Sequence, residues 1–301
     1  MKKFLQNIIA IAKQIPEMPI AMSFIVLVVA GIVVIDLSLP LYAQNFESFY
    51  SNILAEAHGM LFDIFFMGII IFWLNQNAER KQSIKRYMDD IDDLRYWNSD
   101  EAAFKNVGNI KRLNREKIYK LNLSHCYLRK TTLNKVNLDG SNLNSCDLSD
   151  CSLISSNLKN TRFNQSNLQN TRLDFADLEN AYLSGSNMIA SSPIRANFKN
   201  ANLIKSDLSD ALLMEANFDG ACMIGTILEG ANLSKSNLKG SIGLTVEQLL
   251  TVKSLYKANL DYDLKMKLLD INPNLLEETT NSSHKMTIGN QSEVHALQMS
   301  K

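Results

Sequence analysis

The 301-residue sequence has no net charge, because 31 Lys and Arg residues balance 31 Asp and Glu residues. Proteins that bind nucleic acid, or that compete for the surfaces that bind it, need a strong electrostatic field of one sign. A neutral chain lacks that field. We therefore expect no nucleic-acid partner.

The sequence also lacks the motifs of the common enzyme classes. It contains no nucleotide-binding glycine loop, no G-x-S-x-G sequence and no H-E-x-x-H sequence. Its four histidines are scattered and its four cysteines include no C-x-x-C pair, so nothing indicates a metal site. We expect no enzymatic activity, no catalytic residue, no metal and no cofactor.

A five-residue period fills the middle of the chain. Twenty-four consecutive units, centred on residues 123 to 238, carry Leu at the centre in 18 units, Phe in three, Met in two and Pro in one. The residue two before the centre is Ala, Ser, Thr or Cys in 22 units. Helices repeat every 3.6 residues and strands every two, so neither explains this spacing. A fixed period with two inward-type positions per unit is typical of a solenoid.

Units such as SNLKN (156–160), ANFKN (196–200) and ANLSK (231–235) resemble the pentapeptide-repeat family. The resemblance covers residues 121–240. It implies a mainly β fold, a right-handed quadrilateral β-helix with four pentapeptides per coil and about six coils. At about 4.8 Å per coil, the rod would be roughly 29 Å long. One branch of the family mimics DNA through an acidic rod, but these repeats balance 11 Lys and Arg against 11 Asp and Glu.

Two features of the repeats carry further expectations. Pro193 stands at a central position and lacks an amide donor, so we expect a bulge or local widening in the fourth coil. Three of the four cysteines, Cys126, Cys146 and Cys151, occupy the small inward position, and Cys222 lies beside it. Cys126 and Cys146 would stack roughly 5 Å apart, near disulfide reach. In a reducing cytoplasm we expect small buried thiols instead.

Two apolar stretches precede the repeats. Residues 18–37 and 57–76 are each about 20 residues long, the length that crosses a bilayer as a helix. We expect a first transmembrane helix within 18–43, an extracytoplasmic loop at 44–56 and a second transmembrane helix at 57–76. A cleaved signal peptide is the alternative for the first stretch, but its polar leader is too long. Residues 1–17 fit an amphipathic helix lying on the inner leaflet of the lipid bilayer.

The distribution of basic residues predicts the orientation. No Lys or Arg occurs between Lys13 and Arg80, whereas basic residues flank both stretches on their other sides. The positive-inside rule then places both termini and the repeats in the cytoplasm. We expect a multi-pass protein of the bacterial cytoplasmic (inner) membrane.

Helical segments are expected at both ends of the repeats. Residues 77–120 predict a juxtamembrane helix followed by an N-capping helix, and residues 241–276 predict a helical C-terminal cap. Ile84, Tyr87, Ile91 and Leu94 have the spacing of a coiled-coil seam. That seam either pairs two copies of the chain or packs on the first coil, and the sequence leaves both open. The polar stretch 277–301 predicts disorder.

Two groups of residues are candidate sites. Asp36, His58 and Asp63 form a possible intramembrane polar site, because an ionisable group in hydrocarbon usually faces protein or water. The alternative is that Asp36 is interfacial and that Asp63 is protonated or pairs within an oligomer. With twenty residues per coil, the position of a residue within its coil gives its wall. On this count a second group lies on one wall of the rod and forms an apolar partner surface, unless the chain's own helices cover it. Its members are Ile154, Phe175, Ile194, Leu212 and Met214.

The sequence as a whole predicts a non-enzymatic, membrane-anchored scaffold that presents a cytoplasmic β-helical surface to an unidentified protein partner. The alternative function is a subunit or regulator of a membrane transport assembly that uses Asp63 and Asp36. A homo-oligomer is compatible with either function.

Overall fold

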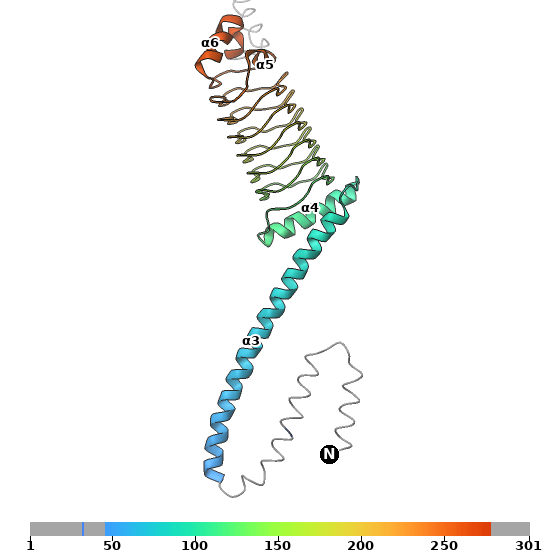
Figure 1. Cartoon of the computed structure of the whole chain (residues 1–301), viewed down its shortest axis with the longest axis vertical. Helices are drawn as coiled ribbons and strands as arrows, with labels where there is room; N and C mark the ends of the chain where they lie inside the picture. Colours follow the sequence, from blue (N-terminus) through green and yellow to red (C-terminus); the bar gives the residue numbers. More distant parts are fainter. Residues whose placement is uncertain (1–31, 33–45, 278–301) are drawn as a thin grey trace, which may run out of the picture. The chain divides into compact units, whose positions relative to one another are not determined.

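The computed structural model describes Ile32 and residues 46–277 of the chain (Figure 1). Within them lie α3 (Phe46–Asp93), α4 (Asp100–Arg115), α5 (Val246–Leu250), α6 (Tyr262–Ile271) and the 3₁₀ helix η1 (Pro273–Leu276). The chain divides into two compact units, residues 1–78 and 79–301. The interfacial helix, the first transmembrane helix and the disordered tail expected from the sequence lie outside the described residues, apart from Ile32 and Glu277.

Helix α3 carries the second apolar stretch. Within the part of the chain that the structure describes, one helix is long and apolar enough to cross a membrane, with a mean hydropathy of 1.9 and none of its apolar window buried. The helix already includes residues 46–56, so most of the segment expected as an extracytoplasmic loop (44–56) is helical. The reason is local, because 46–56 contains no Gly or Pro and is rich in residues that helices accept. The helix also continues without a break into the juxtamembrane segment.

The repeats form a solenoid in which each coil takes twenty residues. Isolated parallel bridges join residues twenty apart, from Asn122 with Asn142 to Cys222 with Ile242. The Leu138 N–H donates to the Asn157 carbonyl (2.8 Å), and the Asn157 N–H donates to the Val136 carbonyl (2.9 Å). The bridges therefore keep a twenty-residue offset, and Figure 1 shows the stacked turns of the chain between α4 and α5. Each contact is a single-residue bridge rather than an extended strand, because a turn follows every bridge.

Each pentapeptide closes with the same turn. The Ser141 N–H donates to the Leu138 carbonyl (2.9 Å), and Gly140 between them has a φ of +67°. The fifth residue of nearly every unit is in this left-handed region, as Asn160 is at +55°. Four such corners give each coil four walls, numbered here 1 to 4 from the unit that contains Leu123. Because the corner residue and the one before it point outward, they are free to differ between units.

The central residues stack into a dry column. Leu138, Leu158 and Leu178 are each 0% exposed and follow one another at twenty-residue intervals on wall 4. Higher on the same wall, the rings of Phe198 and Phe218 are parallel within 3°, with centroids 4.9 Å apart. The small residues two before each centre are buried as well. The core is therefore one continuous column that no surface loop interrupts.

Pro193 does not produce the expected bulge. The neighbouring bridge of Asp177 with Asn197 keeps the twenty-residue offset, and the Phe175 N–H still donates to the Ile194 carbonyl (2.9 Å). Among the described bridges, the pairing of Ser192 with Leu212 is the one missing from wall 3. The correction has a simple cause. The proline ring fills a buried position, and its missing donor removes one hydrogen bond without changing the path of the chain.

The N-terminal end of the solenoid is closed by α4 and the end of α3. The Ser99 hydroxyl accepts a hydrogen bond from the Ala102 N–H and so caps α4, whose Ile110 and Leu113 are fully buried. The predicted seam packs here, since Ile91 and Leu94 are buried while Ile84 and Tyr87 are half-buried against the same core. Of the two alternatives, the structure supports packing within the chain.

The C-terminal end extends further than the sequence indicates. Thr245 and Gln248 form the expected capping box at the start of α5. The Gln248 side-chain amide also donates to the carbonyls of Met223 (3.1 Å) and Thr226 (2.7 Å). Beyond α5, Ser254 and Asn259 bridge to the coil below with an offset of 22 residues instead of twenty. The solenoid thus continues past residue 240, because the short helix absorbs the two extra residues.

The four cysteines are free thiols. Burial raises the pKa of the Cys126 thiol to about 11 and raises the pKa of Cys146 and Cys151 as well. The Cys146 thiol donates to the carbonyls of Leu123 (3.0 Å) and Cys126 (3.1 Å). Three thiols are therefore held as neutral groups inside the column.

This arrangement predicts selective alkylation. At pH 8, iodoacetamide should modify half-buried Cys222 in the native protein, whereas the three buried thiols should react only after unfolding. Mass spectrometry of tryptic peptides before and after denaturation measures the difference. Native labelling of Cys126 as fast as that of Cys222 would contradict the packing described above.

Candidate functional site

Wall 3 carries the main apolar surface of the solenoid. Its outward side chains form three columns along the rod, one from the second, bridged residue of each unit, one from the fourth residue and one from the corner residue. The fourth-residue column contains Ile194 and Met214, and the corner column contains Phe175. These three residues border an open pocket of about 300 Å³. The complete lining is Phe175, Ile194, Arg195, Met214, Glu215, Ser234 and Lys235.

The pocket combines an apolar floor with a charged rim. The Arg195 Nε donates to the Glu215 Oε2 at 2.7 Å, and the Arg195 guanidinium lies 5.6 Å from the centre of the Phe175 ring. This hydrogen bond holds the pKa of Glu215 below its ordinary value, and nearby Lys235 lowers it further. Glu215 therefore stays ionised at neutral pH. Lys235 makes no ion pair with any described residue.

Phe175 stands in a strained position. It is 54% exposed and has a φ of +60°, the left-handed region that bulky residues avoid. The other 23 units place a polar or charged residue, Gly or Ala at this corner. Because strained backbone clusters at binding and switch sites, the large exposed Phe175 ring is a candidate contact residue.

Replacing Phe175 with Asn should therefore stabilise the solenoid. Relief of the left-handed strain is worth about 1–2 kcal/mol, and the lost contact with Arg195 about 0.5–1 kcal/mol. We expect the free energy of unfolding to rise by about 0.5–1 kcal/mol, measured by guanidinium denaturation. A clear loss of stability would show that Phe175 is present for packing rather than for binding.

The structure brings together three of the five residues of the predicted surface. Phe175, Ile194 and Met214 line the pocket, whereas Ile154 and Leu212 do not. Asp174 separates Ile154 from the pocket, because it lies between Ile154 and Ile194 in the same column and accepts a hydrogen bond from the Ser192 hydroxyl (2.7 Å). Leu212, 41% exposed, belongs to the bridged column, on the other edge of the wall. No described helix covers Phe175 or Leu212.

Sequence reasoning missed the charged and polar rim. A count of apolar residues alone, by position in the twenty-residue coil, does not include the four rim residues Arg195, Glu215, Ser234 and Lys235. The same count applied to charged residues places Arg195, Glu215 and Lys235 in one column above Phe175. The signal was therefore present in the sequence.

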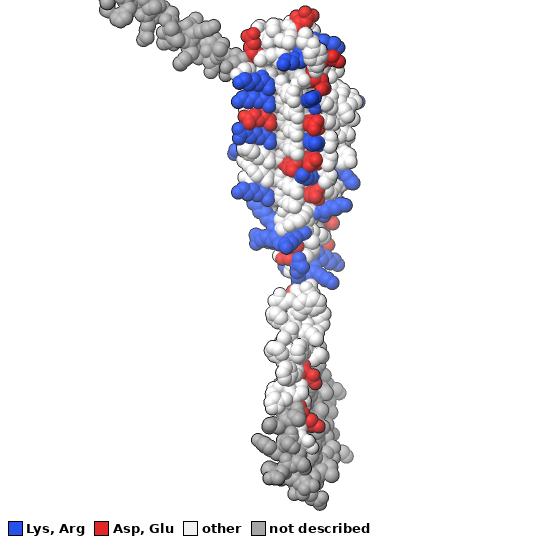
Figure 2. All heavy atoms as spheres, turned by 90° about the vertical axis from the view of Figure 1, so that its left-hand side faces the viewer, with Lys and Arg blue, Asp and Glu red and all other residues white. Residues whose placement is uncertain are grey.

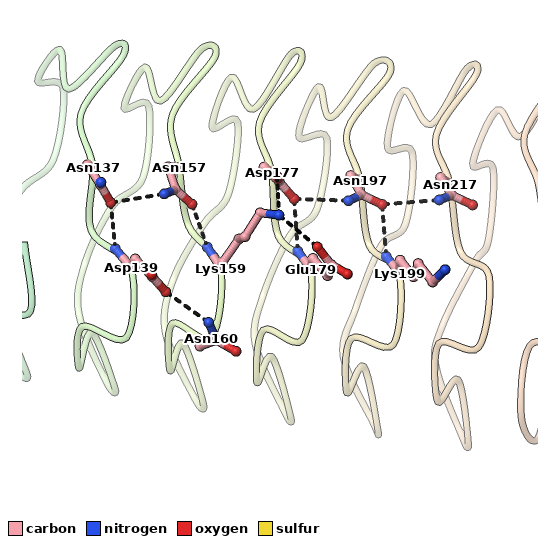
Figure 3. A network of polar contacts seen from close by, with 10 residues as sticks. All are labelled: Asn137, Asp139, Asn157, Lys159, Asn160, Asp177, Glu179, Asn197, Lys199 and Asn217. Atoms are coloured by element: carbon pink, nitrogen blue, oxygen red, sulfur yellow. Dashed lines mark hydrogen bonds and ion pairs between the residues drawn. The ribbon is translucent and has the colours of Figure 1, made fainter.

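Wall 4 is a contrasting surface, because its polar groups satisfy one another (Figure 3). The Asn217 side-chain amide donates to the Asn197 Oδ1 (3.1 Å), and the Asn197 amide donates to the Asp177 Oδ1 (2.9 Å). Beside this ladder runs a column of alternating charge, in which Lys159 pairs with Glu179 at 2.7 Å. The column reads Asp139, Lys159, Glu179, Lys199, Asp219 and Lys239. Most polar side chains of wall 4 thus already have a hydrogen-bond or ion-pair partner on the same wall, which leaves few of them to bind another protein.

Figure 2 shows that charged side chains run in columns along the solenoid, whereas the apolar stretch of α3 carries almost none. Over its six coils, wall 3 has four bases and two acids, and wall 2 has two bases and five acids. The walls therefore differ in charge although the repeats as a whole are neutral.

The residues of the possible intramembrane site are not brought together by what is described. Asp36 lies outside the described residues. His58 and Asp63 are both exposed on α3. They are five positions apart, and at 100° per residue their side chains differ in direction by about 140° around the helix axis. They therefore point to different sides of the helix. Among the described residues, no group of three or more His, Cys, Asp or Glu side chains is placed to hold a metal ion.

Comparison with known proteins agrees with this geometry. The family model for pentapeptide repeats matches eight copies, over residues 122–160, 146–185 and 194–230. No curated protein matches the chain.

Solved structures also resemble the chain. HetL, a pentapeptide repeat protein involved in heterocyst differentiation regulation in the cyanobacterium Nostoc, is 26% identical, with a TM-score of 0.26, over 48% of this chain and 78% of HetL. A pentapeptide repeat protein from the cyanobacterium Cyanothece is 25% identical, with a TM-score of 0.25, over 51% of this chain and 98% of its own. A third, from the thylakoid lumen of Arabidopsis thaliana, is 22% identical, with a TM-score of 0.22, over 48% of this chain and 77% of its own.

Proposed function

Because the repeat region of this chain belongs to the pentapeptide-repeat family, we propose that the protein is a non-enzymatic, membrane-anchored scaffold that docks another protein on wall 3. In this proposal the repeats form a right-handed, four-sided solenoid on the cytoplasmic side of a bacterial inner membrane. The observation that carries the proposal is the pocket around Phe175, where exposed apolar side chains meet a charged rim. Such contiguous apolar surface on a soluble domain marks contact sites.

The apolar stretch of α3, long enough to cross a membrane, supports the membrane-anchored part of the proposal, and contacts beyond it tie the C-terminal end of α3 to the first coil. The Arg95 guanidinium donates to the Ser124 carbonyl (2.8 Å) and hydroxyl (2.6 Å) on the first coil. Arg80 on α3 pairs with Glu116 at 2.6 Å. All of these contacts lie within residues 79–301, where they join the last turns of α3 and the residues after it to the first coil and to the end of α4.

A membrane pull-down tests the proposal. The full-length protein should capture a partner that a version lacking residues 121–240 does not capture. A photo-crosslinking residue at position 194 should join that partner, whereas the same residue at position 199 on wall 4 should not. Cross-linking from position 194 that yields only intrachain products would contradict the proposal.

Asp63 favours a second candidate function, a role in a membrane transport assembly. Its carboxylate is exposed on the apolar stretch of α3, where an ionisable group is costly in hydrocarbon. An Asp63→Asn variant that captures the partner normally but changes transport would support this second function. Unchanged transport would exclude a role for Asp63 there.

A further inference from the structure

We propose that the wall 3 pocket binds an extended segment of the partner protein that carries an apolar residue at one position and Asp or Glu two positions later. This inference rests on the proposed docking function and specifies the chemistry of the partner. It follows from the floor of the pocket, the charge of its rim and the distance between the two.

The floor of the pocket accepts one large apolar side chain. Ile194 and Met214 are half-buried neighbours on successive coils, and the exposed Phe175 ring borders them on the coil below. The volume of about 300 Å³ is at the lower end of the range for ligand pockets. It is open to solvent and no described part of the chain fills it.

The rim of the pocket favours an acidic group. Arg195 and Glu215 neutralise one another through their 2.7 Å pair, which leaves Lys235 as the uncompensated charge at the upper end. Lys253, which is exposed, follows Lys235 in the next, partial coil. A carboxylate on the partner would therefore meet positive charge at this end of wall 3, whereas wall 2, with its excess of acids, would repel it.

The spacing of the coils sets the spacing of the two partner groups. Successive coils are about 4.8 Å apart, and Lys235 is one and a half coils above the midpoint of Ile194 and Met214. Along the axis of the rod, the apolar and acidic groups must therefore be about 7 Å apart. Residues i and i+2 of an extended chain are separated by about 6.6–6.8 Å on the same face.

A second copy of this chain is a poorer occupant. Two wall 3 surfaces would bring like charges together around Lys235, which opposes self-pairing. An anionic lipid surface would bind the lysines, but it would not explain a pocket that accepts one large apolar side chain. Both occupants are outcomes that the following test separates from the proposal.

The test selects random displayed peptides on the full-length protein in nanodiscs of neutral phosphatidylcholine. We expect enrichment of an apolar residue followed two positions later by Asp or Glu. Binding of a selected peptide should weaken at least about tenfold in Lys235→Glu and in Ile194→Ser. The control Lys239→Glu, on the same coil but on wall 4, should bind normally. A peptide whose acidic residue is changed to Lys should regain binding to Lys235→Glu.

Several results would overturn the inference. They are the absence of any enrichment, enriched peptides without the acidic residue, equal losses in Lys235→Glu and Lys239→Glu, and binding to anionic vesicles or to a second copy through the same residues. Unchanged thermal melting of the variants excludes misfolding as the cause of lost binding. Peptides that bind another wall would overturn this inference but leave the scaffold proposal intact, because the pull-down tests that proposal separately.

Discussion

Phe198→Ala is expected to lower the free energy of unfolding by about 3–5 kcal/mol, the usual effect of removing a fully buried aromatic ring. Phe198 is 0% exposed and stacks on Phe218 with centroids 4.9 Å apart. The change leaves a cavity in the buried stack of wall 4, and the bridged coils above and below restrict its collapse. Guanidinium denaturation of the full-length protein, followed by far-ultraviolet circular dichroism, measures the loss.

Phe175→Ala is the matched control, because it removes the same ring from an exposed corner of the solenoid. We expect a loss well below that of Phe198→Ala, because the Phe175 ring is 54% exposed and its removal leaves no buried cavity. Equal destabilisation by the two changes would contradict the assignment of Phe198 to the core and of Phe175 to the surface.

Arg95→Ala is expected to lower the free energy of unfolding by about 1.5–3 kcal/mol, the usual worth of hydrogen bonds to a charged group. The Arg95 side chain is 15% exposed and reaches the Ser124 carbonyl, the Ser124 hydroxyl and, at 3.3 Å, the Asn122 carbonyl. It also pairs with Asp92 at the end of α3. Its removal leaves carbonyls of the first coil without their donor, so the N-terminal cap should open first.

Hydrogen exchange of the first coil, compared with that of the last, measures this local opening. Arg129→Ala is the control, because Arg129 is an exposed arginine that pairs with Asp150 on the solenoid surface at 3.2 Å. We expect little change from it, as for most surface ion pairs. Uniform loss of protection along the whole solenoid in Arg95→Ala would contradict a local anchoring role.

The sequence predicts the core well because the solenoid is built from local repeats. A pentapeptide whose third residue is Leu, as in 156–160, buries that residue on whichever wall it occupies. The period of five therefore determines which side chains point inward without any knowledge of distant contacts. The same regularity predicts the twenty-residue stacking of Leu138, Leu158 and Leu178.

The ends of the elements are less predictable, because they depend on contacts that a period does not encode. The solenoid continues to Asn259 since Gln248 ties α5 to the carbonyls of the coil below, which allows two additional residues to be absorbed. The effect of Pro193 was overestimated for a related reason. Its loss of one donor is small beside the many bridges that hold the adjacent coils.

The candidate site was predicted in part. Counting in twenties finds Phe175, Ile194 and Met214, because wall position follows from residue number once the coil length is known. It also included Ile154, which the intervening Asp174 separates from the pocket. The volume of the pocket and the pairing of Arg195 with Glu215 depend on side-chain conformations, which the sequence pattern does not specify.

A pair of five-residue deletions tests the account most directly. Both deletions keep the inward pattern of the core, so both proteins should fold. Removal of residues 201–205 moves Met214 and Lys235 onto a different wall from Phe175 and Ile194 and so divides the pocket. Removal of residues 156–160 shifts all of the pocket residues together and keeps the pocket whole.

The measurement is capture of the partner in the membrane pull-down, with circular dichroism to confirm folding. We predict that the protein without residues 156–160 captures the partner as the full chain does, and that the protein without residues 201–205 folds but does not capture it. Equal capture by the two deletion variants, or loss of capture in both, would contradict a docking surface assembled on wall 3 by a twenty-residue coil.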